Sequence, residues 1–265
     1  MVVFLICFTI TLLVSTLIPL IKDEYWIFRI FEYPRLQKLA LTVANMILWL
    51  FLISQMNTLH WILFGLLVGN AMYLIYLIFP FTKFAKVQVL RVDNEIPENS
   101  ISVMIGNVYQ DNKNYSGCLA EVKKANPDVL LLVETDAKWE LATKELEKEY
   151  HFSVKVPLEN TYGMLLYSKF ELEDATIHYL VEEGIPSIHA KIKLKSNQLI
   201  QLFAVHPTPP VPNENPSSAE RDKELLMIAD LAKKSEIPVI VIGDLNDVAW
   251  SYTTKLFLKM SGLLD

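Results

Sequence analysis

Apolar and polar positions divide the chain into two parts with different periodicities. Before residue 82, three apolar runs contain no charged residue, at about 1–21, 39–56 and 61–81. Each run is close to the roughly 20 residues with which a helix crosses a bilayer. After residue 99, short apolar runs alternate with longer segments of amphipathic, helical composition. That alternation predicts the strands and helices of an α/β domain.

The three apolar runs predict a membrane domain of residues 1–81 with three transmembrane helices. A cleaved signal peptide is the alternative for the first run, but no basic residue precedes it and no small-x-small site follows it. Buried core helices are the alternative for the other two runs, and such helices are usually shorter and carry a polar stripe. Aromatic residues near the ends of the runs suit the membrane interface. They are Trp26, Trp49, Trp61 and Tyr76.

The second part begins after a linker of mixed polar composition at 82–99, and residues 100–265 form the predicted α/β domain. Strands are expected at 101–107, 129–133, 152–156, 163–168, 187–194, 199–205 and 237–242. Helices are expected at 115–126, 136–150, 219–234 and 248–260. The strands at 187–194 and 199–205 are expected to form a hairpin around Ser196-Asn197.

Charge separates the same two parts. The chain has a formal net charge of −6, and seven basic against three acidic residues give residues 1–92 a net charge of +4, which leaves −10 for 93–265. So acidic a domain lacks the basic surface that duplex nucleic acid normally requires, which disfavours a nucleic-acid partner. The two cysteines, Cys7 and Cys118, allow neither a disulfide framework nor a cysteine metal site.

Basic residues also bear on orientation. The loop after the first run holds Lys22, Arg29, Arg35 and Lys38, whereas the loop after the second run holds no lysine or arginine. With three transmembrane helices, the positive-inside rule places the first loop and the C-terminal domain on the cytoplasmic side.

Polar residues of a few kinds stand where four of the predicted strands end. Asn107, Glu134 and His206 each follow an apolar strand, and Asp244 and Asn246 follow the last one. Each has an ordinary explanation by itself, because Asn after Gly and Asp-x-Asn are common in tight turns. Residues i and i+2 of an extended backbone point to the same face, so Asp244 and Asn246 are expected to reach one point. Strands that end at a common edge would bring all five side chains together.

Five segments carry a resemblance to a known family: Ile105–Asn107, Leu131–Glu134, Tyr162–Ser168, Val205–Thr208 and Ile242–Asp247. In this order they resemble the endonuclease/exonuclease/phosphatase superfamily, over about residues 100–265. The resemblance implies a four-layer α/β sandwich of the DNase I-like type. The membrane runs, with Tyr33–Gln37 before the second, resemble the membrane-anchored bacterial branch of YafD-like and VanJ-like proteins.

The resemblance implies roles for the five strand-end residues. Glu134 would bind Mg²⁺ or Mn²⁺ through a hard carboxylate oxygen, and Asn107 would sit beside it and position the metal or the phosphate. Asp244 would orient and deprotonate the attacking water. Asn246 would hold a phosphate oxygen or that water, and His206 would donate to the phosphate or the leaving oxygen.

Two further residues are weaker candidates for contact with the substrate phosphate. They are Tyr162, for which packing is an equal alternative, and Arg221, for which a solvated helix position is the alternative.

The chain departs from the family pattern at its end. The pattern continues with a further supporting Asp and a Ser-Asp-His, whereas this sequence ends at Leu263-Leu264-Asp265. We therefore expect a C-terminally truncated or partial domain, without the last strands of its second sheet, and a slow catalyst.

These observations predict a membrane-anchored phosphoesterase dependent on Mg²⁺ or Mn²⁺, with the lipid bilayer and a phosphate ester as partners. A lipid (prenyl) phosphate acted on outside the cytoplasm is the substrate that the resemblance favours, against the charge count. A nuclease of the same superfamily and a catalytically dead binding or scaffold protein are the alternatives.

Overall fold

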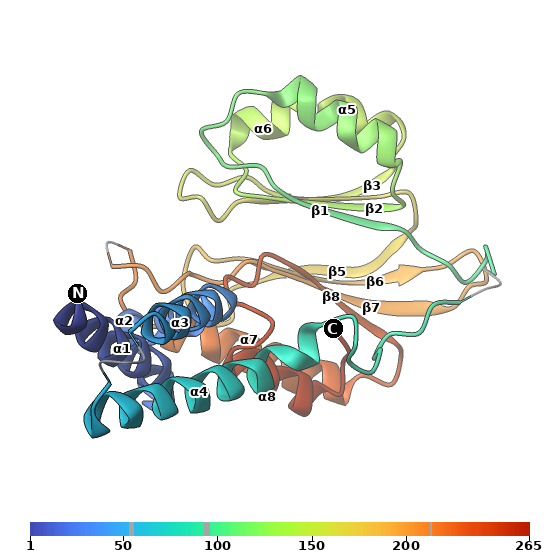
Figure 1. The fold of residues 1–265 in the computed structure, drawn as a ribbon. Helices are drawn as coiled ribbons and strands as arrows, with labels where there is room; N and C mark the ends of the chain where they lie inside the picture. Colours follow the sequence, from blue (N-terminus) through green and yellow to red (C-terminus); the bar gives the residue numbers. More distant parts are fainter. Residues whose placement is uncertain (53–55, 93–95, 213) are drawn as a thin grey trace. The chain divides into compact units, whose positions relative to one another are not determined.

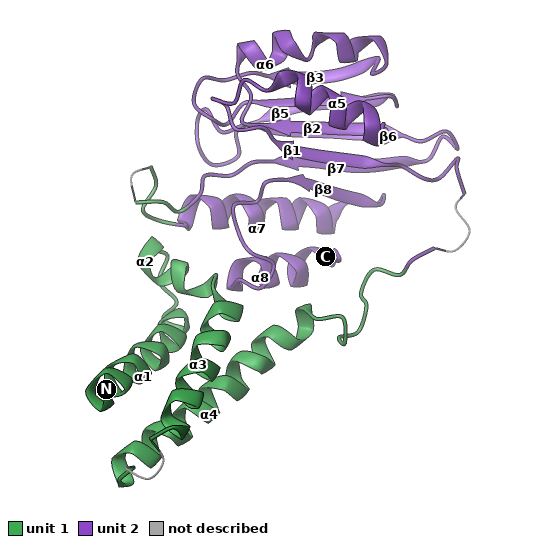
Figure 2. Ribbon diagram, turned by 45° about the horizontal axis from the view of Figure 1, so that its top comes forward, with its two compact units in different colours: residues 1–90, 210–217 green, residues 91–209, 218–265 purple. Residues whose placement is uncertain are grey.

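The computed structural model describes residues 1–52, 56–92, 96–212 and 214–265. These residues form two compact units (Figure 2). Unit 1 comprises Met1–Leu90 and Pro210–Ser217, and unit 2 comprises Arg91–Pro209 and Ser218–Asp265.

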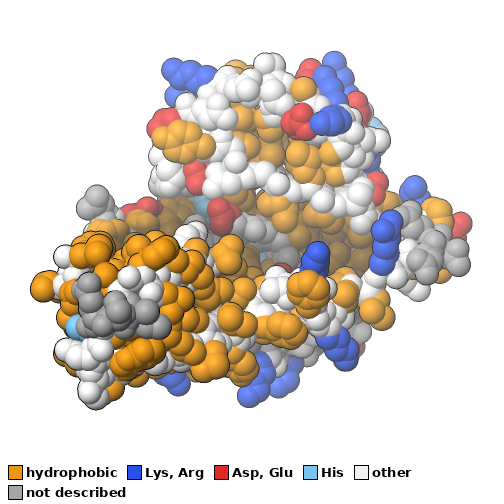
Figure 3. Space-filling model, in the orientation of Figure 1, with side chains coloured by type: hydrophobic (Ala, Val, Ile, Leu, Met, Phe, Trp, Pro, Cys, Tyr) orange, Lys and Arg blue, Asp and Glu red, His pale blue; other side chains and the backbone are white. Residues whose placement is uncertain are grey.

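Unit 1 is helical. Its elements are α1 (Val2–Leu17) with a 3₁₀ turn (Ile18–Leu20), α2 (Trp26–Arg29) with a 3₁₀ turn (Ile30–Glu32), α3 (Arg35–Leu50), and α4 (Thr58–Ile78) with a 3₁₀ turn (Phe79–Phe81). Leu5 and Leu12 of α1 pack with Trp49 of α3 and Leu67 of α4 in one apolar cluster. Much of the remaining helix surface is also apolar, and Figure 3 shows these hydrophobic side chains gathered over the helices of unit 1.

Two helices in the described part of the chain are long and apolar enough to cross a membrane, namely Val2–Leu20 and Thr58–Phe81. The expectation of three such helices is not met. The run at 39–56 forms α3, which begins at Arg35 and ends at Leu50, while residues 53–55 lie outside the described residues. Its 16 residues span about 24 Å, less than the roughly 30 Å of a bilayer core.

α3 also carries a polar stripe. Lys38, Thr42 and Asn45 are spaced on one face of the helix and are buried within unit 1. Asn45 Nδ2 donates to Thr9 Oγ1 of α1 at 2.9 Å, and Asn70 Nδ2 of α4 donates to Thr42 Oγ1 at 3.0 Å. Side-chain hydrogen bonds of this kind hold helices together where the surroundings are apolar. α3 therefore carries the polar stripe that is usual for buried helices.

Unit 2 contains two four-stranded sheets (Figure 1). The strands are β1 (Val103–Asn107), β2 (Val129–Val133), β3 (Phe152–Val156), β4 (Met164–Ser168), β5 (Leu172–His178), β6 (Ser187–Lys193), β7 (Leu199–Val205) and β8 (Val239–Gly243). The first sheet has the order β1-β2-β4-β3 and the second has the order β5-β6-β7-β8. β1 and β2 are parallel, as are β7 and β8, and the other neighbours are antiparallel.

The two sheets pack face to face through their apolar side chains. Leu131 and Leu166 of the first sheet share a buried cluster with Ile188, Leu202 and Ile242 of the second. β2 and β4 are buried along their whole length, which explains why their sequences are continuous apolar runs rather than alternating ones.

Helices cover the outer face of each sheet. α5 (Tyr115–Ala125) and α6 (Ala137–Ala142), with a 3₁₀ turn at Lys144–Lys148, pack on the first sheet. α7 (Ala219–Lys234) and α8 (Tyr252–Ser261) pack on the second. In Figure 1 these helix pairs lie on opposite sides of the two sheets.

Three elements of unit 2 differ from the sequence prediction. β5 was not expected, because Leu172–His178 is half-buried or exposed and contains no apolar run. The helix expected at 136–150 ends at Ala142 and continues as the 3₁₀ turn. α8 begins at Tyr252 rather than 248, because the Ser251 side chain caps it by accepting from Thr254 N.

Candidate functional site

Strand register brings the predicted site residues to one edge of unit 2. Asn107 is the partner of Val133 in the parallel pair β1–β2, so Asn107 and Glu134 leave the first sheet together. Val205 is the partner of Gly243 in the parallel pair β7–β8, so the residues that follow these strands also leave together. Hydrogen bonds join three of the five predicted polar residues, Asn107, Glu134 and Asp244, at the ends of these strands.

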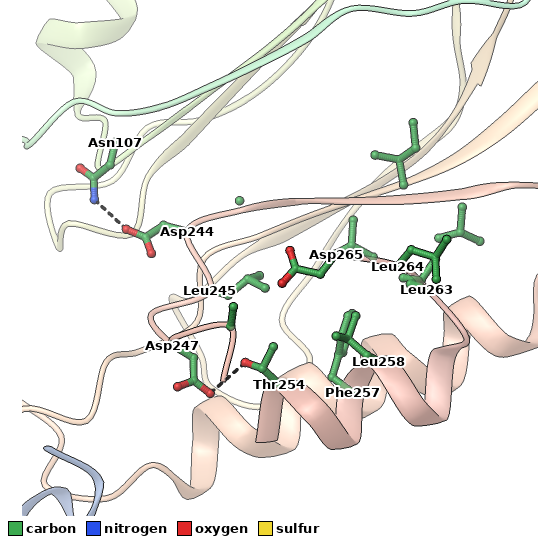
Figure 4. A pocket seen from close by; sticks show the side chains of 15 residues that line it. Asn107, Asp244, Leu245, Asp247, Thr254, Phe257, Leu258, Leu263, Leu264 and Asp265 are labelled. Carbon is green, nitrogen blue, oxygen red and sulfur yellow. Dashed lines mark hydrogen bonds between the residues drawn. The ribbon is translucent and has the colours of Figure 1, made fainter. Parts of the chain in front are cut away.

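The Asn107 amide connects carboxylates of the two sheets. Its Nδ2 donates to Glu134 Oε1 at 2.6 Å and to Asp244 Oδ2 at 3.1 Å, and Figure 4 shows the second of these bonds. Its Oδ1 accepts from Tyr109 N at 3.0 Å, which fixes the orientation of the amide. Three side chains predicted from the sequence therefore meet at one point.

The backbone around Glu134 is unusual. Glu134 has φ 59°, in the left-handed region that non-glycine residues rarely adopt. Next to it, Thr135 N donates to Gly163 O at 3.1 Å, so the two backbones run in close contact. A Cβ at position 163 would lie 1.8 Å from Thr135 O, which no side chain can tolerate. Glycine at 163 thus permits the turn that presents Glu134.

We expect Gly163→Ala to displace the Thr135 backbone and to lower the stability of the full chain by about 2–4 kcal/mol. Thermal unfolding in detergent measures this effect. Gly65→Ala is the matched control, because no heavy atom lies within 4 Å of the Cβ position at Gly65 in α4. Equal melting temperatures for the two variants would contradict the assignment.

The backbone after β8 is not extended, contrary to the geometry expected for Asp244 and Asn246. β8 ends at Gly243, which has φ 145°, and Asn246 has φ 50°. Asp244 Oδ1 instead accepts from Asn246 N at 3.0 Å in a tight turn. The Asn246 amide turns away and donates from Nδ2 to Pro207 O at 2.8 Å. It therefore ties the β8 turn to the segment that follows His206.

His206 and Tyr162 are neighbours in the structure. Their ring centroids lie 5.3 Å apart with an interplanar angle of 44°, and the side chains are only 3% and 5% exposed. Tyr162 therefore packs against the His206 imidazole, which is a contact of the kind that the packing alternative expects. Its contact with phosphate stays a prediction.

Arg221 is not a solvated helix residue, because it is 1% exposed in α7. Its Nη1 donates to the carbonyl oxygen of Asn246 at 2.7 Å. The guanidinium therefore lies beneath the β8 turn rather than on the surface of the helix.

The donor set at Asn107 suits a divalent metal ion that takes water and substrate phosphate as its remaining ligands. Among the described residues, no group of three or more His, Cys, Asp and Glu side chains could hold a metal ion. The Glu134 and Asp244 carboxylates, both bonded to one amide nitrogen, nevertheless offer hard oxygen ligands side by side. Mg²⁺ is commonly held by one or two carboxylates, with water and substrate phosphate as its other ligands.

A cavity of about 670 Å³ adjoins these residues. Asn107, Asp244 and Asp247 line its polar part, while residues of β8 and α8 line its apolar part (Figure 4).

Sequence reasoning missed a buried carboxylic acid close to the site. Glu224 of α7 is 2% exposed, and its Oε1 has no hydrogen-bond partner among the described residues. Burial, with the Glu182 carboxylate nearby, raises the pKa of Glu224 to about 7. Glu182 in turn accepts from Thr208 Oγ1 at 2.6 Å, two residues after His206. The signal available in the sequence was a charge next to Leu225 on the apolar face of the helix.

This pKa predicts a pH-dependent stability. Unfolded Glu224 loses its proton near pH 4.5, and the folded state retains it up to about pH 7. Stability therefore falls as the pH rises through that window, and above it the cost is about 3 kcal/mol. We expect Glu224→Gln to raise the melting temperature at pH 8 and to change it little at pH 5. Exposed Glu183→Gln is the control, and an identical shift at both pH values would contradict the prediction.

Solved structures of other proteins are similar to part of this chain. The human nocturnin catalytic domain with bound sulfate is similar at TM-score 0.50 and 21% identity, covering 61% of this chain and 70% of that one. A humanized D. rerio TDP2 with 14 mutations is similar at TM-score 0.49 and 19% identity, covering 62% of this chain and 67% of that one. A β-hairpin deletion mutant of beta toxin from Staphylococcus aureus is similar at TM-score 0.48 and 18% identity, covering 63% of this chain and 74% of that one.

A search of curated proteins gave no match. A family model does match, however, over residues 106–265, which is more than half of the chain and includes all five strand-end residues. The chain therefore belongs to the endonuclease/exonuclease/phosphatase family.

Proposed function

We propose that the chain is a metal-dependent phosphoesterase that cleaves a phosphate ester or diester. The observation that carries the proposal is the Asn107 amide, which holds the Glu134 and Asp244 carboxylates of two sheets at one point. Two adjacent carboxylates and an amide at a solvent-accessible strand edge suit metal-assisted phosphoryl transfer better than a purely structural role.

The three residues that meet at the Asn107 amide have different proposed roles. Glu134 would hold Mg²⁺ or Mn²⁺, with Asn107 orienting its carboxylate, and the bound ion would neutralise charge on the phosphoryl oxygens. Asp244 would accept a proton from the attacking water as a general base. The Asn107 amide keeps the carboxylate of Asp244 in place for that transfer.

His206 and Asn246 would act on the phosphate from the second sheet. His206 would donate to a phosphoryl or leaving oxygen, with its ring held against Tyr162. One hydrogen of the Asn246 amide is committed to Pro207 O, so the amide is held in place. Its second hydrogen and Oδ1 would contact a phosphate oxygen or the water. Tyr162 would add a weaker phosphate contact.

A membrane location supports a lipid phosphate as the substrate. The helices Val2–Leu20 and Thr58–Phe81 would anchor unit 2 to the bilayer. The net charge of −10 for residues 93–265 disfavours the nucleic-acid alternative, since duplex binding relies on basic contacts with phosphates. A prenyl phosphate or a similar lipid would bring its phosphate to a site held near the membrane surface.

Two spans in place of three change the orientation argument. The segment between α1 and α4 contacts the loop 210–217, because Trp26 N donates to Pro216 O at 2.8 Å, so it lies on the same side as the loop that joins β7 to α7. Lys22, Arg29, Arg35 and Lys38 lie between the spans, against Lys83, Lys86 and Arg91 after the second one. The count of four against three therefore does not decide the orientation, and the proposed extracytoplasmic placement of unit 2 rests on the family resemblance.

Labelling in intact cells tests this orientation. We expect Asn99→Cys, in a Cys7→Ser/Cys118→Ser background, to react with a membrane-impermeant maleimide before lysis. Labelling only after lysis would place unit 2 in the cytoplasm.

The substrate is tested with the full chain in detergent and in proteoliposomes with Mg²⁺ or Mn²⁺. Three substrates are compared: bis(p-nitrophenyl) phosphate, a prenyl phosphate and a short DNA duplex. Enzyme is used in excess so that a single turnover is detected. We expect metal-dependent cleavage of the diester and the lipid. Cleavage of DNA alone would support the nuclease alternative, and metal binding without any cleavage would support the binding-protein alternative.

A further inference from the structure

A buried network of charged side chains lies beneath the β8 turn. It begins with Arg221 in the first turn of α7, whose Nε and Nη2 donate to Asp222 Oδ1 at 3.0 and 2.8 Å. Asp222 Oδ2 accepts from Ser218 Oγ at 2.9 Å, at the N-cap of α7. These bonds hold the guanidinium through one oxygen of its neighbour's carboxylate.

The same guanidinium contacts the turn at two places. Nη1 donates to Asn246 O at 2.7 Å, and Nη2 lies 3.5 Å from Asp247 Oδ2. The side chains of Arg221 and Asp247 are each only 1% exposed, so this ion pair is almost completely removed from water. Charge interactions are screened least in such a place.

Asp247 links the turn to α8. Its Oδ2 accepts from Ser251 Oγ at 2.5 Å and from Thr254 Oγ1 at 3.2 Å, the second bond being drawn in Figure 4. Its Oδ1 accepts from Val248 N at 2.8 Å. The turn that carries Asp244 is consequently held between the first turns of two helices, through one arginine and one aspartate.

The conformation of the turn requires such support. Asn246 has φ 50°, a left-handed backbone conformation that persists where its surroundings impose it. In this conformation the Asn246 carbonyl faces Arg221, while the Asp244 carboxylate faces Asn107. A buried ion pair adds little net stability, because desolvation offsets its attraction. Its value here lies in selecting one conformation of the turn.

We propose that Arg221 and Asp247 are positioning residues that hold the Asp244–Asn246 turn in the geometry of the reactive state. This inference deepens the proposed function, on which its kinetic readout rests. It gives Arg221 a role through the turn in place of direct phosphate contact. Loss of the pair would leave substrate affinity nearly intact and would slow the chemical step, because small misplacements of a catalytic group are costly.

Arg221→Lys is the sharpest test, since lysine keeps the charge but cannot bond Asp222 and the Asn246 carbonyl with one planar fork. We expect kcat for bis(p-nitrophenyl) phosphate to fall about 10–100-fold, with KM within about twofold. Lys223→Arg, at an exposed position two residues along α7, is the control and should leave both constants unchanged. A rise in KM with unchanged kcat would overturn the proposal in favour of phosphate contact.

Hydrogen–deuterium exchange of the full chain provides a readout that does not depend on activity. We expect amides of residues 244–250 to exchange at least about tenfold faster in Arg221→Lys and in Asp247→Asn, with β2 and β6 unchanged. Unchanged exchange at 244–250 in both variants would overturn the positioning role. If the wild type shows no turnover while exchange responds as expected, the proposed function fails and the positioning inference stands.

Discussion

Asp244→Asn is expected to lower kcat about 10²–10⁴-fold, the range that general-base catalysis contributes. Asparagine has nearly the same shape but cannot take a proton from water. In the wild type, Asp244 accepts from Asn107 Nδ2 and from Asn246 N through its two oxygens. The substitution replaces one of these acceptors with an NH₂ group, which would face an N–H donor. Because the substitution removes the group that accepts the proton, the decrease in rate should appear in kcat at saturating substrate.

Stopped assays with bis(p-nitrophenyl) phosphate measure this effect, and melting temperatures confirm folding. Asp230→Asn is the matched control, because Asp230 is exposed on α7 and pairs with Lys234 on the same helix. The control should retain wild-type kcat. An Asp244→Asn enzyme with wild-type kcat would remove Asp244 from the proton transfer.

Glu134→Gln is expected to weaken Mn²⁺ binding by more than about 100-fold, because even residues that only support metal ligands typically contribute 10–100-fold. Glutamine keeps an oxygen that can accept from Asn107 Nδ2, so the geometry of the turn is preserved while one negative charge is removed. Hard cations depend strongly on carboxylate charge. Activity should return in part at high metal concentration.

Calorimetric titration with Mn²⁺ measures the affinity for Glu134→Gln and for Glu121→Gln. The second variant is the control, since Glu121 lies exposed on α5 and pairs only with Lys124 among the ion pairs of the structure's described residues. Equal affinities for wild type and Glu134→Gln would mean that the metal, if bound, lies elsewhere.

The parts of the fold that the sequence predicted well are those whose physical cause is local. β2 coincides with the expected strand at 129–133, because burial on both faces demands an unbroken apolar run. α7 coincides with the helix expected at 219–234. β5 could not be found this way, since it is held by pairing with β6 and not by burial of its own side chains.

Unit 1 shows a limit of apolar length as a criterion for transmembrane helices. α3 lies in a run without charge at 39–56, yet the helix starts at Arg35 and places Lys38, Thr42 and Asn45 on a buried face. These three residues are separated by one or two helical turns. The whole stripe is seen only when the helix is extended to Arg35, because Lys38 lies before the apolar run. The total hydrophobicity of the run concealed its polar stripe.

The candidate site was predictable where strands end and unpredictable where loops turn. Parallel register brought Asn107 and Glu134 together as expected from strand order. Asp244 and Asn246 do not share an extended face, because Gly243 and Asn246 both adopt positive φ. The network through Arg221 and Asp247 joins residues 26 positions apart, and no local pattern marks such a pairing.

We propose that Asn107, Glu134 and Asp244 form a metal-dependent phosphoesterase site. The most direct measurement is single-turnover cleavage of bis(p-nitrophenyl) phosphate by the full chain with Mg²⁺, with excess EDTA, and by Asp244→Asn with Mg²⁺. We predict cleavage by the wild type with Mg²⁺, no cleavage above background with EDTA, and a rate at least about 100-fold lower for the variant. Cleavage by Asp244→Asn at the wild-type rate, or an equal wild-type rate in EDTA, would contradict the claim.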